Sequence, residues 1–202
     1  MLEDLLNILA SSIGSLTNTT KLENTFRSER HVNISHNTIS AYIDKFIDAF
    51  ILKKVARYDI KGRKYIGAQQ KYFYSDVGLR NARLNFRQQE ENHIMENIIY
   101  NELTARGFSV DVGVIETVIV NTEGKRQHSL LEVDFVCHRG HARYYIQSAL
   151  TVAEESKRQQ ETNSLIKINP SLISQNYFRL FLGVLAELTC WYSSTASCKV
   201  EL

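Results

Sequence analysis

The 202-residue sequence is poor in proline and cysteine and has no long hydrophobic run. Pro170 is the single proline, and no low-complexity segment or internal repeat is present. The three cysteines, Cys137, Cys190 and Cys198, are odd in number and lack CxxC spacing. We therefore expect a reducing, cytoplasmic location without a disulfide framework. No apolar run approaches the roughly 20 residues of a membrane helix, and the acidic N-terminal segment does not resemble a signal peptide.

The net charge is also small. A formal charge of +2 does not by itself indicate a nucleic-acid partner, so local charge has to support such a role. The motif G-x-x-x-x-G-K-[ST] is absent, which excludes ATP hydrolysis by a P-loop within this chain. Hydrophobic residues at 44% and charged residues at 23% are ordinary for a soluble globular protein, and the length allows one domain or two small ones.

The pattern of helical and strand-like segments over residues 1–76 predicts a winged helix-turn-helix domain. Apolar residues at helical spacing predict a first helix over 1–13 that ends at Gly14. Thr19 or Thr20 is expected to cap a short second helix, and Ser35 a longer third one. Two strand-like segments on either side of a turn at 61–63 then predict a hairpin. Three helices followed by a hairpin is the element order of a winged helix.

The third helix and the hairpin carry the candidate DNA-binding residues, because this is the most basic stretch of the chain. They are His36, Asn37, Ser40, Lys45, Lys53, Arg57, Lys61, Arg63 and Lys64. The helix would lie at a groove and the wing on phosphates. The alternative is a protein-packing module whose basic side chains are simply solvated. The recognition face has no arginine and the same helix carries Asp44 and Asp48, so the sequence gives little support to base reading.

The second half predicts an α/β (α+β) sandwich with a mixed sheet. Residues 77–87 indicate a connecting helix, and a second domain is expected over 88–168. There a long helix ends at Gly107, and four strand-like segments follow: FSVDVGVI, ETVIVN, LLEVDFV and RYYIQSAL. A polar helix, TVAEESKRQQETNSL, is expected next. Cys137, His138 and His141 flank an expected turn at 139–140, which favours a hairpin over a zinc site.

Three side chains on these elements predict a metal site of the kind found in restriction-endonuclease-like nucleases. Glu96 lies on the long helix, with Glu102 as the alternative, and Asp134 and Gln147 lie on successive strands. Alternation places Glu132 on the face of Asp134, where it is a possible replacement carboxylate. Glu96 and Asp134 are the predicted ligands of Mg²⁺ or Mn²⁺, which prefer carboxylate oxygens and activate water for phosphodiester hydrolysis.

The last position of this site departs from the nuclease pattern. A Glu-x-Lys is normal there, whereas this chain has Tyr145-Ile146-Gln147. Glutamine can orient water by hydrogen bonding but supplies no charge. An active nuclease, a metal site without efficient cleavage and a scaffold without catalysis therefore all stay open.

Several motifs resemble a domain of unknown function found at the C-terminus of prokaryotic AAA+-type ATPases. They are SHNTISAYIDKFIDAFILKKVARYDIKGRKYIGAQQKYFYSDVGLRNARL, MENIIYNELTARGFSVDVG, LEVDFV and YYIQSAL, and the resemblance covers residues 1–168. It implies a winged helix followed by a restriction-endonuclease-like, PD-(D/E)XK-type domain. The family motifs E-N, E-V-D-F-V and Y-I-Q-V carry over to Glu96–Asn97, Glu132–Val136 and Tyr145–Gln147. Gln147 is thus the residue that the resemblance leads us to expect.

The resemblance leads to two hypotheses. In the first, the chain is the C-terminal module of an AAA+-type ATPase protein, lacks the ATPase domain and associates with DNA. In the second, it is a non-catalytic interaction module that docks on an ATPase domain or forms a homo-oligomer, without a role for nucleic acid or membrane. From about Ser171 the apolar tail no longer matches, so we expect residues 169–202 to be a divergent or frameshifted end with irregular packing or an adhesive surface.

Overall fold

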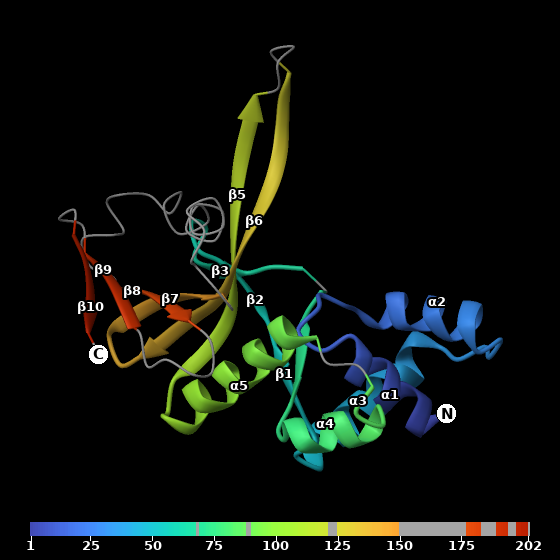
Figure 1. The fold of residues 1–202 in the computed structure, drawn as a ribbon. Helices are drawn as coiled ribbons and strands as arrows, with labels where there is room; N and C mark the ends of the chain where they lie inside the picture. The colour runs from blue at the N-terminus through green and yellow to red at the C-terminus, as the bar shows by residue number, and fades with distance from the viewer. Residues whose placement is uncertain are drawn as a thin grey trace. The chain divides into compact units, whose positions relative to one another are not determined.

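The computed structural model describes residues 1–67, 69–87, 90–120, 125–149, 177–182, 189–193 and 197–201 (Figure 1). The chain forms two compact units that interleave along the sequence. The first unit comprises residues 1–56 and 67–101, and the second comprises residues 57–66 and 102–202. These units divide the chain differently from the boundaries expected at residues 76 and 88. The polar helix expected over 151–165 lies outside the described residues.

Helices dominate the first unit. They are α1 (Leu2–Ser11), α2 (Thr19–Glu29), α3 (His36–Asp48), α4 (Val77–Arg83) and α5 (Glu91–Ala105), the last of which continues into the second unit. Ser35 caps α3 as expected, because its hydroxyl accepts a hydrogen bond from the Thr38 amide at 3.2 Å. At α2 the cap is Asn18, whose Oδ1 accepts from the Lys21 amide at 2.7 Å. The first three helices and their order agree with the sequence analysis.

The wing hairpin is divided between the two units. Its base strands, β1 (Leu52–Val55) and β4 (Lys71–Tyr74), pair antiparallel in the first unit. Its outer strands, β2 (Arg57–Asp59) and β3 (Lys64–Tyr65), pair antiparallel in the second unit. The turn at its tip is closed by Asp59, whose Oδ1 accepts from the amides of Lys61 at 3.1 Å and Gly62 at 3.0 Å.

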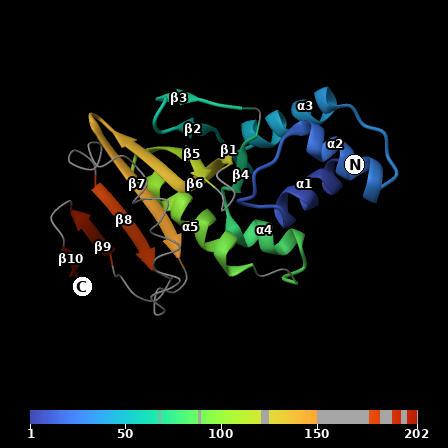
Figure 2. The same cartoon turned by 90° about the horizontal axis from the view of Figure 1, so that it is seen from above.

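The second unit is built on a mixed sheet. Its strand order is β10-β9-β8-β7-β6-β5-β2-β3 (Figures 1 and 2). The strands not yet introduced are β5 (Ser109–Val120), β6 (Arg126–Arg139), β7 (Ala142–Ala149), β8 (Tyr177–Leu182), β9 (Thr189–Ser193) and β10 (Ser197–Glu201). The β2–β5 and β7–β8 pairs are parallel, and the other pairs are antiparallel. The fold class is therefore confirmed: α+β, with N-terminal helices followed by a mixed sheet.

The C-terminal tail contributes three strands to this sheet. β8 lies parallel to β7, and β9 and β10 extend the sheet by antiparallel pairing. The expectation of irregular packing concerns side chains that the structure does not describe, so it stays a prediction. Between β6 and β7, the turn at Gly140 and His141 agrees with the expected hairpin, and Gly140 has a φ of 59°.

A β-bulge interrupts β6 at the predicted site. Asp111 of β5 lies opposite Val136 and Gly113 lies opposite Val133, so β6 has one more residue than β5 between these two pairs. Val133 and Val136 therefore belong to the same buried cluster, together with Tyr58, Ile60, Ile115 and Tyr145. The bulge changes the alternation on which the sequence analysis relied. Regular alternation would place Phe135 on the face of Val133, whereas Phe135 is buried but does not belong to this cluster.

Candidate functional site

The polar face predicted for α3 is accessible. His36, Asn37 and Lys45 are exposed and Ser40 is half-buried, whereas Ile39, Ile43 and Phe46 face the core. The exposed Asp44 and Asp48 lie on the same helix. Since the acidic side chains offset the single lysine, this helix alone offers a weak electrostatic attraction for phosphates.

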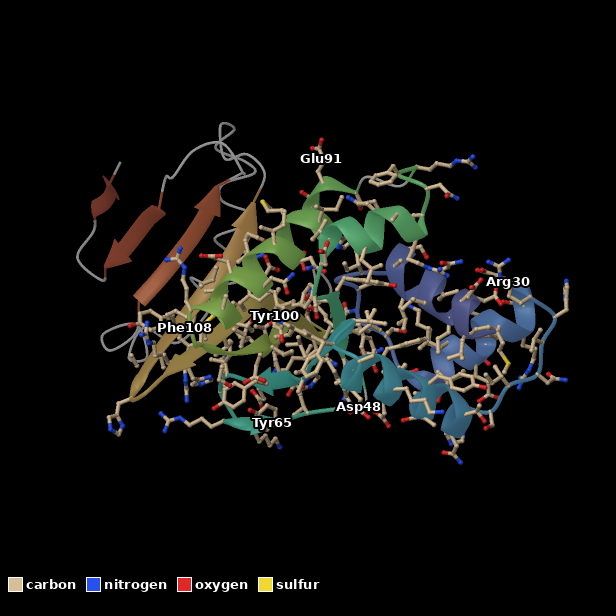
Figure 3. All side chains as sticks on the ribbon, turned by 90° about the horizontal axis from the view of Figure 1, so that it is seen from below. Arg30, Asp48, Tyr65, Glu91, Tyr100 and Phe108 are labelled. Carbon is tan, nitrogen blue, oxygen red and sulfur yellow. The ribbon has the colours of Figure 1, made fainter. Side chains whose placement is uncertain are left out.

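The basic residues of the wing fall into two groups. Lys61, Arg63 and Lys64 are exposed at its tip, near Tyr65 of β3 (Figure 3). Nearer the base, Arg57 is half-buried, and the half-buried Lys53 has its Nζ 5.7 Å from the centroid of the Tyr100 ring. The tip therefore presents three charges to an approaching ligand, whereas Lys53 also packs against its own unit.

Glu96 forms a buried ion pair that the sequence analysis missed. Its Oε2 lies 3.0 Å from Nζ of Lys71, and the two side chains are only 12% and 4% exposed. His93 Nδ1 lies 4.0 Å from the other carboxylate oxygen. Gly14, with a φ of 71°, leaves room for this group, because a Cβ there would lie 3.0 Å from His93 Nδ1 and 3.2 Å from Glu96 Oε2. A lysine next to three aromatic residues in a buried strand is the signal that could have identified Lys71.

The neighbouring asparagine fixes α5 to β4. Asn97 is fully buried, accepts a hydrogen bond from the Tyr74 amide at 2.8 Å and donates one to the Tyr74 carbonyl at 2.8 Å. Asn101 donates to the same carbonyl at 2.9 Å. Glu96 and Asn97 thus contact the base of the wing through consecutive side chains, which gives the E-N motif a structural role within the first unit.

Glu102, the alternative carboxylate, is exposed. Its side chain is 56% exposed, and Oε1 lies 2.6 Å from Nε of Arg106. A helical wheel of about 100° per residue would place Glu102 and Ile98 on the apolar side of α5, but Glu102 is exposed and Ile98 is 41% exposed. The buried face of α5 instead carries Met95, Asn97, Ile99, Tyr100 and Leu103. The buried face of α5 thus includes a polar side chain, Asn97.

Asp134 and β7 form a second group, within the second unit. Asp134 is 7% exposed, and its Oδ2 accepts from the Ser148 amide at 2.7 Å and the Ser148 hydroxyl at 2.5 Å. The side chain of Gln147 contacts the main chain of Asp134: its Oε1 accepts a hydrogen bond from the Asp134 amide at 3.4 Å. The side chain expected to orient water thus supports the bulged strand, and Ser148 is the polar partner that the sequence analysis missed.

The carboxylates predicted to bind metal lie in different units. Glu96 belongs to the first unit and Asp134 to the second, and their meeting at one ion stays a prediction. Glu132 is half-buried on β6 opposite Val114 of β5. In the part of the chain that the structure describes, no three His, Cys, Asp or Glu side chains form a group that could hold an ion. Within its own unit each of these carboxylates has a partner in the protein, Lys71 for Glu96 and Ser148 for Asp134.

A third polar group crosses the second unit near the wing tip. Tyr65 donates to Oδ2 of the buried Asp111 at 3.2 Å, and burial raises the pKa of both groups. Arg143 Nε donates to His138 Nε2 at 2.9 Å, and burial together with this guanidinium lowers the pKa of His138. The Arg143 guanidinium lies 5.4 Å from the centroid of the Tyr58 ring. Spacing along the sequence gave no signal for this group, because it combines residues from five strands.

Comparison with known proteins identifies similar sequences, but none of them has a described activity. Residues 1–90 match the family described as Domain of unknown function (DUF8612). An uncharacterized protein from Haemophilus influenzae is 33% identical over 182 residues, which cover 88% of this chain and 41% of that protein. The chain thus spans about two fifths of that relative's length. No solved structure matches the chain. None of the helices described is long and apolar enough to cross a membrane.

Proposed function

We propose that this chain is a DNA-associated module in which the winged helix binds the phosphate backbone and the following mixed sheet forms a nuclease-like domain. Its expected partner in longer relatives is an AAA+-type ATPase domain. The observation that supports the proposal is the cluster of exposed basic residues at the wing tip, Lys61, Arg63 and Lys64. Cations on a protruding hairpin can contact phosphates without reading base sequence.

The turn at the wing tip is held by main-chain and side-chain hydrogen bonds. Strand β2 pairs parallel with β5 through Arg57 opposite Val112 and Asp59 opposite Val114, and the Ile60 amide donates to the Val114 carbonyl at 3.0 Å. The Asp59 carboxylate closes the turn between β2 and β3. A turn held by a sheet on one side and a carboxylate on the other presents its lysines with a reduced entropic cost of binding.

Catalysis is the less supported part of the proposal. Active restriction-endonuclease-like sites bring carboxylates to a metal ion, whereas Glu96 here binds Lys71 and Asp134 binds Ser148. We therefore propose that DNA association is the main activity and that any cleavage depending on Mg²⁺ or Mn²⁺ is weak.

A salt titration of DNA binding tests the association. The logarithm of the binding constant should fall linearly with the logarithm of the salt concentration, with a slope of about −0.9 per phosphate contact. The variant Lys61→Glu/Arg63→Glu should weaken binding and make the slope shallower by about two. Arg30→Glu/Arg87→Glu reverses two exposed charges that are not part of the wing and is the matched control, for which we expect the original slope.

Two results would reject the parts of the proposal separately. No detectable binding at low salt would reject DNA association and favour a module that docks on an ATPase domain. The catalytic part is tested with plasmid and branched DNA in the presence of Mg²⁺ or Mn²⁺. If nothing is cleaved and Asp134→Ala alters neither metal binding nor DNA binding, the nuclease assignment is wrong while DNA association stands.

A further inference from the structure

Strands β5 and β6 continue beyond the rest of the sheet as a two-stranded arm (Figure 1). Pairing between them extends from Glu116 opposite Leu130 to Val120 opposite Arg126. On the β5 side, the described pairing with β2 ends at Val114, and on the β6 side the pairing with β7 ends at Phe135. We define the arm as residues 116–120 and 126–130. Among the described strands, none pairs with either outer edge of the arm.

One face of the arm exposes apolar side chains. Val118 is 52% exposed and Leu130 is 58% exposed, and alternation places them on the same face as Glu116 and His128. His128 Nδ1 and Glu116 Oε1 lie 2.8 Å apart across the two strands. The exposed face thus combines a cross-strand polar pair with two apolar side chains at diagonal positions. Two large apolar side chains on a protruding ribbon favour a protein partner.

The two edges of the arm differ in their protection against pairing. The β6 edge carries Arg126 and His128, and charged side chains discourage the addition of another strand. The β5 edge begins at the charged Glu116 and continues with Thr117, Val118, Ile119 and Val120, which are all β-branched and uncharged, without proline or glycine. This composition strongly favours strand pairing. Of the two edges, the β5 edge is therefore the one that favours pairing with an additional strand.

We propose that the β5 edge of the arm pairs with the same edge of a second copy of this chain. Antiparallel pairing about Val118 places Val118 opposite Val118 of the other copy, Thr117 opposite Ile119 and Glu116 opposite Val120. No like charges are then opposed, and the twofold symmetry closes the assembly as a dimer. The two hairpins form a four-stranded sheet in which Val118 of one copy lies beside Val118 of the other, with Leu130 of each copy at a diagonal position on the same face.

The proposed interface is short, so the dimer is expected to be reversible. Five paired residues span about 17 Å, which is small compared with obligate dimer interfaces. Sedimentation velocity over a range of concentrations should show a shift from monomer to dimer. Val118→Lys opposes two ammonium groups at the twofold axis and should abolish the shift. Gln127→Lys adds the same charge on the β6 edge and should leave the shift unchanged.

Cysteine cross-linking tests the register directly. Residues opposite themselves at the axis have Cβ atoms about 4.5–5.5 Å apart, a separation that allows a disulfide after a small adjustment. Under a mild oxidant, Val118→Cys should form a covalent dimer above the background of the unsubstituted chain. Thr117→Cys, which lies opposite Ile119, should not.

Three results would overturn the proposal. The first is a chain that stays monomeric at the highest soluble concentration. The second is a dimer that persists in Val118→Lys. The third is a dimer in which Val118→Cys gives no more cross-linking than Thr117→Cys. Circular dichroism and thermal melting of each variant show whether the fold is retained. A failure of self-pairing would leave the DNA-binding proposal untouched, because the arm and the wing tip are tested by different variants.

Discussion

The ammonium group of Lys71 lies 3.0 Å from the carboxylate of Glu96, and both side chains are shielded from solvent. The pair joins β4, at the base of the wing, to α5, the helix that carries the predicted catalytic carboxylate. A charge left without its partner in such surroundings is expensive. Loss of activity on substitution of Glu96 would therefore not by itself demonstrate a catalytic role, and stability has to be measured alongside it.

A double-mutant cycle measures this ion pair. Lys71→Met and Glu96→Leu should each lower the free energy of unfolding by about 3–5 kcal/mol, because each leaves the charge of the other residue buried without its partner. The variant Lys71→Met/Glu96→Leu should lose much less than the sum of the single changes. Urea denaturation provides the values. The exposed pair Glu102–Arg106 is the control, where Arg106→Ala should cost less than about 1 kcal/mol. Additive effects at Lys71 and Glu96 would contradict the coupling.

Asn97→Ala tests the attachment of α5 to β4. The substitution leaves the amide and the carbonyl of the buried Tyr74 without the two bonds that Asn97 makes, and each lost partner costs about 1–3 kcal/mol. The carbonyl retains its bond to Asn101, so the loss at that atom should be the smaller one. Asn92→Ala changes an exposed residue of the same helix and is the control in urea denaturation. Equal stability of the two variants would disprove the structural role of the E-N motif.

The sequence predicted most helices but not how the strands are distributed. Helical spacing and caps are local signals, so α2 and α3 began where Thr19 and Ser35 indicated, within a residue. The division of the wing between two units depends on the pairing of β2 with β5, which lies some fifty residues further along the chain. Local patterns contain no information about such a partner.

At the candidate site, the contacts that the sequence did not predict also have a physical explanation. The sequence analysis assumed that side chains alternate regularly along β6, including at Asp134. The bulge breaks this alternation, so Phe135 does not share the face of Val133. Asp134 was identified as a buried polar position, whereas Ser148 as its partner required the register of β7. A bulge changes the count of residues without changing their type, and composition therefore does not reveal it.

Gly113→Ala should destabilise the second unit. A Cβ at this position would lie 2.7 Å from Val136 Cγ2 and 2.9 Å from Ile60 Cδ1, so the packed cluster must shift. We expect a loss of about 1–3 kcal/mol in urea denaturation. Val136→Ala removes the nearest atom, and Gly113→Ala/Val136→Ala should therefore be more stable than the sum of the two single effects predicts. A double variant that shows no such recovery would indicate that the cost is not steric.

Because the pKa of His138 is lowered in the folded chain, we expect the stability of the protein to depend on pH. Burial and the Arg143 guanidinium lower its pKa from the ordinary 6.5, against a smaller opposing effect of Asp111. The unfolded chain then takes up the proton first, so the free energy of unfolding should fall as the pH drops below 6.5, until His138 in the folded chain is also protonated. Urea denaturation between about pH 5 and pH 8 measures the slope.

The variant His138→Gln isolates this contribution, because it keeps an acceptor for Arg143 and removes the titration. We expect a flatter dependence on pH in this variant than in the unsubstituted chain. His141→Gln, at the exposed turn between β6 and β7, should retain the original dependence. An unchanged slope in His138→Gln would show that another group is responsible.

The interleaving of the two units determines how this chain can be shortened. A truncation after residue 87 would keep β2 and β3 but remove β5, against which β2 is aligned. A fragment starting at residue 88 would keep β5 to β10 but lose the two strands that complete the edge of the sheet. Neither fragment contains a whole unit, so deletion mapping at a single cut would report misfolding instead of domain function. Point substitutions in the full-length chain avoid that outcome.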